Sequence, residues 1–124
     1  MEFRDNKAIY LQIAEYVCEH ILLEKWQVEQ KVPSVRELAV QLEVNPNTVM
    51  RTYELLQNKN IINNKRGVGF FVSDDALEHV KNYRKTQFIE DELPTVFRNL
   101  YLLEVGFDEL RDRYNSFVKE TFNL

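Results

Sequence analysis

The sequence predicts a mainly α-helical fold with one small β-hairpin, and three observations lead to that prediction. Residues 34–42 and 45–58 combine helix start signals with apolar residues at helical spacing. Residues 61–72 hold two short apolar segments on either side of a turn with glycines. Residues 74–124 return to helical spacing. Together these patterns predict a winged helix-turn-helix over 1–73, followed by a short helical segment over 74–124.

The composition limits the kind of protein. The chain has 124 residues, of which 44% are hydrophobic, so we expect one compact domain, or one domain plus a small appendage. Neither a signal peptide nor a membrane-spanning stretch is recognisable. The single cysteine, Cys18, excludes an internal disulfide and lies among apolar residues, which predicts a buried thiol. We therefore expect a cytoplasmic protein without membrane association.

The first predicted helix covers residues 6–24. Asn6 is a plausible N-cap, and the apolar residues that follow repeat every fourth position and form one stripe. That stripe consists of Ile9, Ile13, Val17 and Ile21, and it is widened by Tyr10, Ala14 and Leu22.

The next two helices carry clear start signals. Ser34 is a good N-cap, and Glu37, three residues later, completes a capping box. Asn45 is the second N-cap, and Pro46 occupies the first helical position, where its missing N–H costs nothing. Only two residues separate the helices. So tight a turn predicts a helix-turn-helix unit, whose second helix, 46–58, can enter a DNA major groove.

The polar face of helix 46–58 carries the functional signal. Asn and Arg are the side chains whose geometry suits adenine and guanine edges. Asn47, Thr48 and Arg51 lie in the first turns, the part of a recognition helix that sits deepest in the groove. A polar face is common on any surface helix, but this position favours DNA contact for these residues. For Glu54 and Asn58, solvation is the better interpretation.

The hairpin at 61–72 is interpreted as a wing. Lys65 and Arg66 place positive charge at the turn, and Gly67 and Gly69 permit it. An ordinary hairpin with a solvated tip is the alternative. We favour a wing because a basic tip next to a recognition helix can reach neighbouring phosphates or the minor groove.

The charge distribution supports this assignment despite a net charge of −4. Residues 31–72 hold six basic and three acidic residues, a net of +3, whereas residues 75–124 hold seven basic and ten acidic residues, a net of −3. The negative charge therefore lies mostly outside the candidate binding surface. We expect modest non-specific affinity for DNA and a need for specific contacts.

The segment 74–124 is too short for a separate ligand-binding domain, yet it is rich in large apolar side chains. We expect a helix capped by Asp74, an interruption near Pro94, and a helix that ends at Gly106. Because helix-turn-helix proteins usually read two half-sites as symmetric dimers, we assign the segment to homodimerisation rather than to folding back on its own winged helix. The candidate interface residues are Leu77, Val80, Phe97, Leu100, Tyr101, Leu110, Tyr114 and Phe117.

The order of these motifs resembles the winged-helix domain of GntR-family bacterial transcriptional regulators. The resemblance covers roughly residues 7–73. It rests on Pro-Ser-Val-Arg-Glu-Leu-Ala, on Val-Asn-Pro-Asn-Thr-Val, and on Asn-Ile-Ile followed by Arg-Gly-Val-Gly-Phe-Phe-Val. The Asn-Pro-Asn-Thr-Val form and the short C-terminal segment 74–124, called the tail below, look most like the YtrA-like subfamily. The resemblance implies DNA contacts by Arg36, Asn45, Asn47, Thr48, Arg51, Arg66 and Gly67, and dimerisation by the tail.

The sequence departs from the family pattern in the turn between the two helices, where Glu43 replaces a common glycine. A glutamate in a left-handed conformation costs about 1 kcal/mol, and its charge lies near the DNA-facing unit. Asn60 replaces another common glycine, which asparagine tolerates well.

These observations predict a sequence-specific DNA-binding regulator, more specifically a repressor that binds a pseudo-palindromic operator as a homodimer. A small-molecule effector, if there is one, would bind at the dimer interface or between the tail and the winged helix. The alternative is a winged helix that binds protein, which would require apolar residues on the exposed face of helix 46–58. We find no nucleophile–base pair, metal cluster or phosphate-binding loop, so we expect no enzyme activity, no cofactor and no metal.

Overall fold

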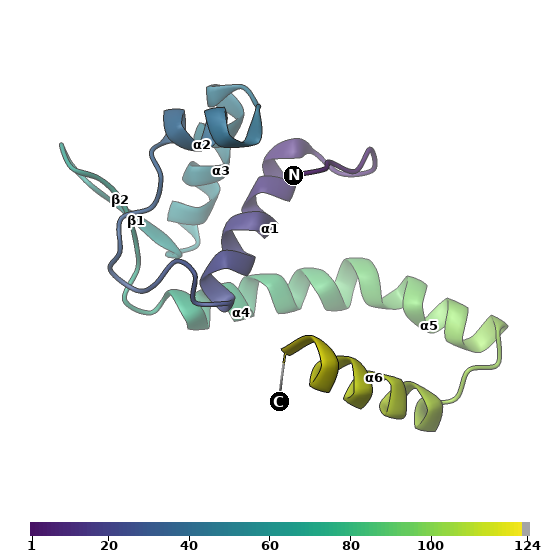
Figure 1. The fold of residues 1–124 in the computed structure, drawn as a ribbon. Coiled ribbons are helices and arrows are strands. Elements are labelled where there is room, and N and C mark those ends of the chain that lie inside the picture. The colour runs from purple at the N-terminus through teal and green to yellow at the C-terminus, as the bar shows by residue number, and fades with distance from the viewer. Residues whose placement is uncertain (123–124) are drawn as a thin grey trace. The chain divides into compact units, whose positions relative to one another are not determined.

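The computed structural model describes residues 1–122, and these form two compact units, 1–85 and 86 onward. The first unit contains α1 (Ile9–Leu22), α2 (Val35–Leu42), α3 (Pro46–Asn58), β1 (Ile62–Lys65), β2 (Gly69–Val72) and nearly all of α4 (Ala76–Gln87) (Figure 1). The second contains the π-helical turn η1 (Phe88–Glu92), α5 (Leu93–Leu102) and α6 (Phe107–Phe122). The predicted mainly α-helical fold with one hairpin is confirmed.

The core of the first unit lies between α1, α2 and α3. The apolar stripe of α1 packs on α3, and α2 packs on α3 from another side. The hairpin adds Ile62 and Val72, which face each other across the two antiparallel strands. Cys18 is buried in this core as predicted, and burial raises the pKa of its thiol to about 12. The thiol is therefore protonated at neutral pH and serves as a small apolar group.

The first helix is shorter than predicted. It begins at Ile9 after Ala8, whose side chain provides no cap, and not at Asn6. The buried side chain of Gln12 explains the difference: its amide donates to the carbonyl oxygens of Arg4 and Lys7, both at 2.7 Å, and its oxygen accepts from the Arg4 N–H at 2.7 Å. These bonds hold residues 4–7 in a turn against α1, so the helix cannot extend through them.

The fourth helix belongs to the first unit, whereas the sequence analysis assigned it to the tail. Ala76 and Val80 are completely buried in the core, and the first unit extends to Lys85 instead of ending at residue 73. The Nε2–H of His79 donates to the Asp75 carboxylate at 2.9 Å, one turn earlier in the chain.

From residue 86 to residue 122 the second unit is helical, apart from the turn at 103–106 that reverses the chain direction between α5 and α6 (Figure 1). The predicted interruption near Pro94 takes the form of η1, a π-helical turn that ends directly before α5, and Pro94 lies in the first turn of α5. The prediction that Gly106 ends a helix is wrong: α5 ends at Leu102, and Glu104 adopts the left-handed conformation. No residue of α5 or α6 is buried.

Glutamate occupies most of the left-handed positions outside glycine. Among residues 1–122, positive φ angles occur at five non-glycine residues, and four of them are glutamates: Glu24, Glu29, Glu43, Asn60 and Glu104. Glu43 has φ 56° and ψ 48°, and its N–H and that of Val44 return to carbonyl oxygens at the end of α2. The backbone of the usual glycine turn is therefore kept, with the strain that a Cβ adds.

Glu43→Gly is expected to raise the free energy of unfolding by about 0.5–1 kcal/mol, because glycine adopts this left-handed conformation without a Cβ clash. Urea denaturation monitored by circular dichroism measures the change. Asn60→Gly is the matched control, since asparagine already tolerates φ 59° and should gain little. A Glu43→Gly protein no more stable than the wild type would show that the turn is not strained.

Candidate nucleic-acid interface

Two N-caps determine where the helices of the helix-turn-helix, α2 and α3, begin. The Ser34 hydroxyl accepts from the Glu37 N–H at 3.1 Å, and the Glu37 carboxylate accepts from the Ser34 N–H at 2.9 Å. The Ser34 N–H lowers the pKa of the Glu37 carboxyl group, because it donates to the ionised carboxylate that caps α2. The Asn45 side-chain oxygen accepts from the Asn47 N–H at 2.8 Å and starts α3. Both predicted caps are confirmed.

Buried contacts fix α3 on three neighbours. The hydroxyl of the fully buried Tyr53 donates to the Pro33 carbonyl oxygen at 2.6 Å, in the segment that leads into α2. Its ring meets the Phe70 ring of β2 edge to face, with centroids 5.0 Å apart. Thr52, also fully buried, donates to the Tyr10 carbonyl oxygen of α1 at 2.7 Å. One face of α3 is thus held by α1, by the loop before α2 and by the wing.

The opposite face of α3 carries the predicted base-reading residues. Asn47 and Arg51 are exposed, one helical turn apart, and Thr48 is half-buried beside them. Asn45 is exposed too, but its side-chain oxygen is occupied by the cap, so the amide N–H₂ is the group it can offer to DNA. Arg36 is exposed on α2. The structure therefore brings all five side chains to accessible positions of the same helix-turn-helix unit.

Arg51 has a neighbour that the sequence analysis did not assign to the site. Its guanidinium carbon lies 3.8 Å from the centroid of the Tyr10 ring, a close cation–π contact between α3 and α1. The sequence analysis placed Tyr10 only at the edge of the apolar stripe of the first helix. No local pattern could have identified the pair, because its members are 41 residues apart.

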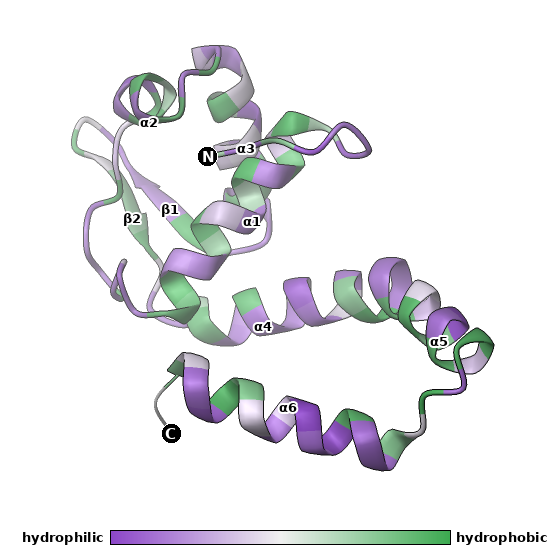
Figure 2. Ribbon diagram, turned by 45° about the vertical axis from the view of Figure 1, so that its right-hand side comes forward, coloured by the Kyte–Doolittle hydropathy of each residue, from purple (hydrophilic) through white to green (hydrophobic). Residues whose placement is uncertain are grey.

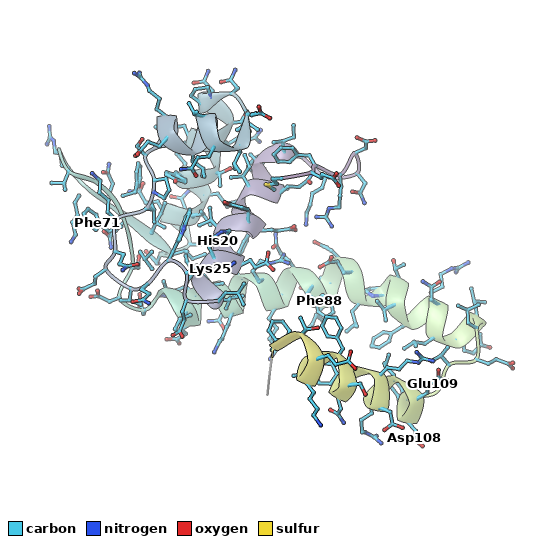
Figure 3. The ribbon with its side chains drawn as sticks, in the orientation of Figure 1. His20, Lys25, Phe71, Phe88, Asp108 and Glu109 are labelled. Carbon is cyan, nitrogen blue, oxygen red and sulfur yellow. The ribbon has the colours of Figure 1, made fainter. Side chains whose placement is uncertain are left out.

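The wing has the predicted turn and one unpredicted strand partner. Lys65 pairs with Gly69 across the hairpin, Gly67 adopts φ 78° at the tip, and Lys65, Arg66 and Gly67 are exposed. Lys31 forms an isolated antiparallel bridge with Phe71, a residue of β2 that Figure 3 labels on the hairpin. The Lys31 side chain crosses Gly69 so closely that an added Cβ would lie 2.8 Å from it. Lys31 thus adds a cation to the base of the wing.

The predicted interface residues of the tail fall into two groups. Val80 is buried in the core of the first unit, and Leu77 packs against that core. The six others lie on α5 and α6 of the second unit, where Leu100 and Leu110 are half-buried and the four aromatic residues are exposed: Phe97, Tyr101, Tyr114 and Phe117. Figure 2 shows apolar residues distributed along both helices.

Residues 1–122 contain neither a metal-binding cluster nor a membrane-spanning helix. No group of three His, Cys, Asp or Glu side chains in this range is placed to hold a metal ion. Within the same residues, no helix is both long enough and apolar enough to cross a membrane.

Comparison with known proteins places this architecture in a family. Residues 9–72 match the family described as "Bacterial regulatory proteins, gntR family". The chain is 40% identical over 118 residues to the uncharacterized HTH-type transcriptional regulator YhcF of Bacillus subtilis, covering 95% of this chain and 96% of YhcF. It is 31% identical over 109 residues to the HTH-type transcriptional repressor YtrA of the same organism, covering 88% of this chain and 83% of YtrA.

Solved structures agree with the sequence matches. A GntR-family transcriptional regulator from Bacteroides thetaiotaomicron superposes with a TM-score of 0.70 at 46% identity, over 91% of this chain and 98% of that one. The DNA-binding domain of AraR, solved in complex with its operator ORR3, superposes with a TM-score of 0.53 at 27% identity, over 59% of this chain and 86% of that one. The chain therefore belongs to the gntR family of bacterial regulatory proteins and is a helix-turn-helix transcriptional regulator.

Proposed function

We propose that this regulator binds a pseudo-palindromic operator as a homodimer in the cytoplasm, with α3 in the major groove and the wing on adjacent phosphates or in the minor groove. The single observation that carries the proposal is the division of α3 into two faces. Val49, Thr52, Tyr53 and Leu56 fix one face in the core, while Asn47 and Arg51 stand exposed on the other. A rigidly held helix with an amide and a guanidinium one turn apart suits readout of adenine and guanine.

The basic groups around α3 fit the same role. Arg36, Lys65 and Arg66 are exposed on α2 and the wing, and Lys31 lies at the base of the wing. We assign these cations to phosphates, which position the protein without reading sequence. The AraR DNA-binding domain, which superposes on 59% of this chain, is bound to its operator, and this supports a role in binding DNA.

Homodimerisation is proposed from the second unit. Its helices bury none of their residues, and Tyr101 on α5 is 83% exposed while Phe117 on α6 is 58% exposed. So many large apolar side chains exceed what a small monomeric unit normally leaves in water. A second copy of the tail would cover them and would place two α3 helices on successive half-sites. An effector, if the protein has one, would act at this interface.

Repression is the proposed sign of regulation, because the relative YtrA is a transcriptional repressor. We further propose that the chain acts by binding DNA and has no enzyme activity. A role in binding protein instead of DNA fits α3 less well. Met50, which is 40% exposed, is the one large apolar side chain between residues 46 and 58 with substantial exposure, and the other exposed side chains from residue 47 to residue 58 are polar.

Selection of duplexes from a random pool tests the proposal. The enriched sequence is expected to be an inverted repeat whose half-site centres lie about 10 base pairs, or one helical turn, apart. Enrichment of a single, asymmetric half-site would contradict the dimer while preserving specific binding. No enrichment over the starting pool would contradict the proposed function itself.

A further inference from the structure

We infer that Tyr10 of α1 is a specificity-determining positioning residue, which holds the Arg51 guanidinium ready for base readout by stacking on its face. The inference rests on the proposed function, because it concerns how Arg51 reaches DNA. The observation behind it is the distance of 3.8 Å between the Arg51 guanidinium carbon and the centroid of the Tyr10 ring.

The geometry of a stacked arginine leaves its hydrogen-bonding edge available. The five N–H donors of a guanidinium lie in its plane, and an aromatic ring covers only its face. Reading guanine requires two of those in-plane donors, directed at the O6 and N7 atoms. Within residues 1–122, no carboxylate forms an ion pair with Arg51. Tyr10 therefore restrains the side chain without consuming the groups that would meet a base.

The backbone that carries the Tyr10 ring is held in place. The Tyr10 carbonyl oxygen accepts the buried Thr52 hydroxyl at 2.7 Å, and Thr52 is the residue that follows Arg51 in α3. The Thr52 hydroxyl also lies 3.2 Å from the Thr48 carbonyl oxygen, so it joins α1 to the first turns of α3. The backbone of Tyr10 is tied to the helix whose arginine its ring holds, which keeps the two groups in register.

The restraint has a consequence for binding. A free arginine side chain samples many rotamers and loses that freedom when it binds a base, which weakens the complex. A side chain already held by an aromatic face loses less rotamer freedom when it binds a base. Tyr10 is thus expected to strengthen binding to the operator, where Arg51 meets its base, and to matter little on unrelated DNA, where binding depends on phosphates.

The test measures affinities for the selected operator and for a scrambled duplex by fluorescence anisotropy. Tyr10→Leu keeps apolar bulk and the backbone bond to Thr52 but removes the π-face. We expect operator affinity to fall by about three- to tenfold, with affinity for the scrambled duplex unchanged. Tyr10→Phe, which keeps the ring, is expected to bind like the wild type.

Two controls separate positioning from a loss of stability. Tyr16→Leu changes a half-buried tyrosine of the same helix whose ring contacts His20 and Trp26 instead of Arg51, and it should leave operator affinity unchanged. Thermal unfolding by circular dichroism confirms that each variant is folded at the titration temperature. A general loss of structure would lower affinity for both duplexes alike.

A double-mutant cycle decides the question. In an Arg51→Ala background, Tyr10→Leu should change operator affinity by less than about twofold, because the group that Tyr10 holds is gone. An equal loss in both backgrounds, or no loss in either, would overturn the inference while leaving the proposed function intact. Failure of the wild type to prefer any duplex would overturn both.

Discussion

Arg51→Ala and Asn47→Ala are each expected to weaken binding to the operator by about 10- to 100-fold, the range for losing one good bidentate base contact. Both side chains are exposed in the first two turns of α3, and neither contributes to the buried face. Their removal should therefore spare the fold and the weak binding to scrambled DNA. Anisotropy titrations of both variants against both duplexes measure the effect.

Asn58→Ala is the matched control for this prediction. Asn58 is an exposed amide on the same face of the same helix, but it lies in the last turn, away from the bases. The Asn58→Ala protein should bind the operator with the affinity of the wild type. If all three variants lost the same affinity, or if none did, the recognition role of the first turns of α3 would be wrong.

Charged substitutions on the tail are expected to separate the dimer and to remove most of its operator affinity. The double variant Tyr101→Asp, Phe117→Asp places carboxylates at exposed apolar positions of α5 and α6. Desolvating two carboxylates in an apolar interface costs several kcal/mol, which weakens association by orders of magnitude because each 1.4 kcal/mol is a factor of about ten in affinity. Because a dimer joins two half-site contacts, its loss should lower operator affinity by about 100-fold or more.

Sedimentation velocity measures the assembly directly. The wild type should sediment at about twice the chain mass of 14.9 kDa and the double variant at the chain mass itself. Val28→Asp, which alters an exposed apolar side chain of the first unit, is the control and should remain dimeric. A wild type that sediments as a monomer at micromolar concentration, or a double variant that stays dimeric, would show that the tail is not the interface.

The sequence allowed the helix-turn-helix to be predicted closely because its boundaries are local. Ser34 with Glu37, and Asn45 with Pro46, act within four residues, and the structure begins both helices where these signals lie. The left-handed conformation at Glu43 was expected from the family resemblance, in which a glycine commonly occupies this position, and the structure has it. Capping signals of this kind need no knowledge of the rest of the fold.

The features that could not be predicted from the sequence depend on contacts between residues that are far apart in the chain. Gln12 shortens α1 by binding a turn that precedes it, and Val80 turns inward because α4 packs on the core of the first unit. The contact of Tyr10 with Arg51 and the bridge of Lys31 with Phe71 join segments about 40 residues apart. The predicted helix end at Gly106 is wrong for another reason. Glutamate is a poor residue for the left-handed conformation, yet Glu104 adopts that conformation just after α5.

Whether α3 reads DNA sequence can be decided by one anisotropy experiment. The selected operator and a duplex of the same composition in scrambled order are titrated at two salt concentrations. Binding to phosphates alone weakens steeply with salt on both duplexes, whereas base contacts add a preference that salt does not remove. If α3 reads bases, the operator is bound more tightly than the scrambled duplex at both salt concentrations. Equal affinities that fall together as salt rises would contradict sequence reading by α3.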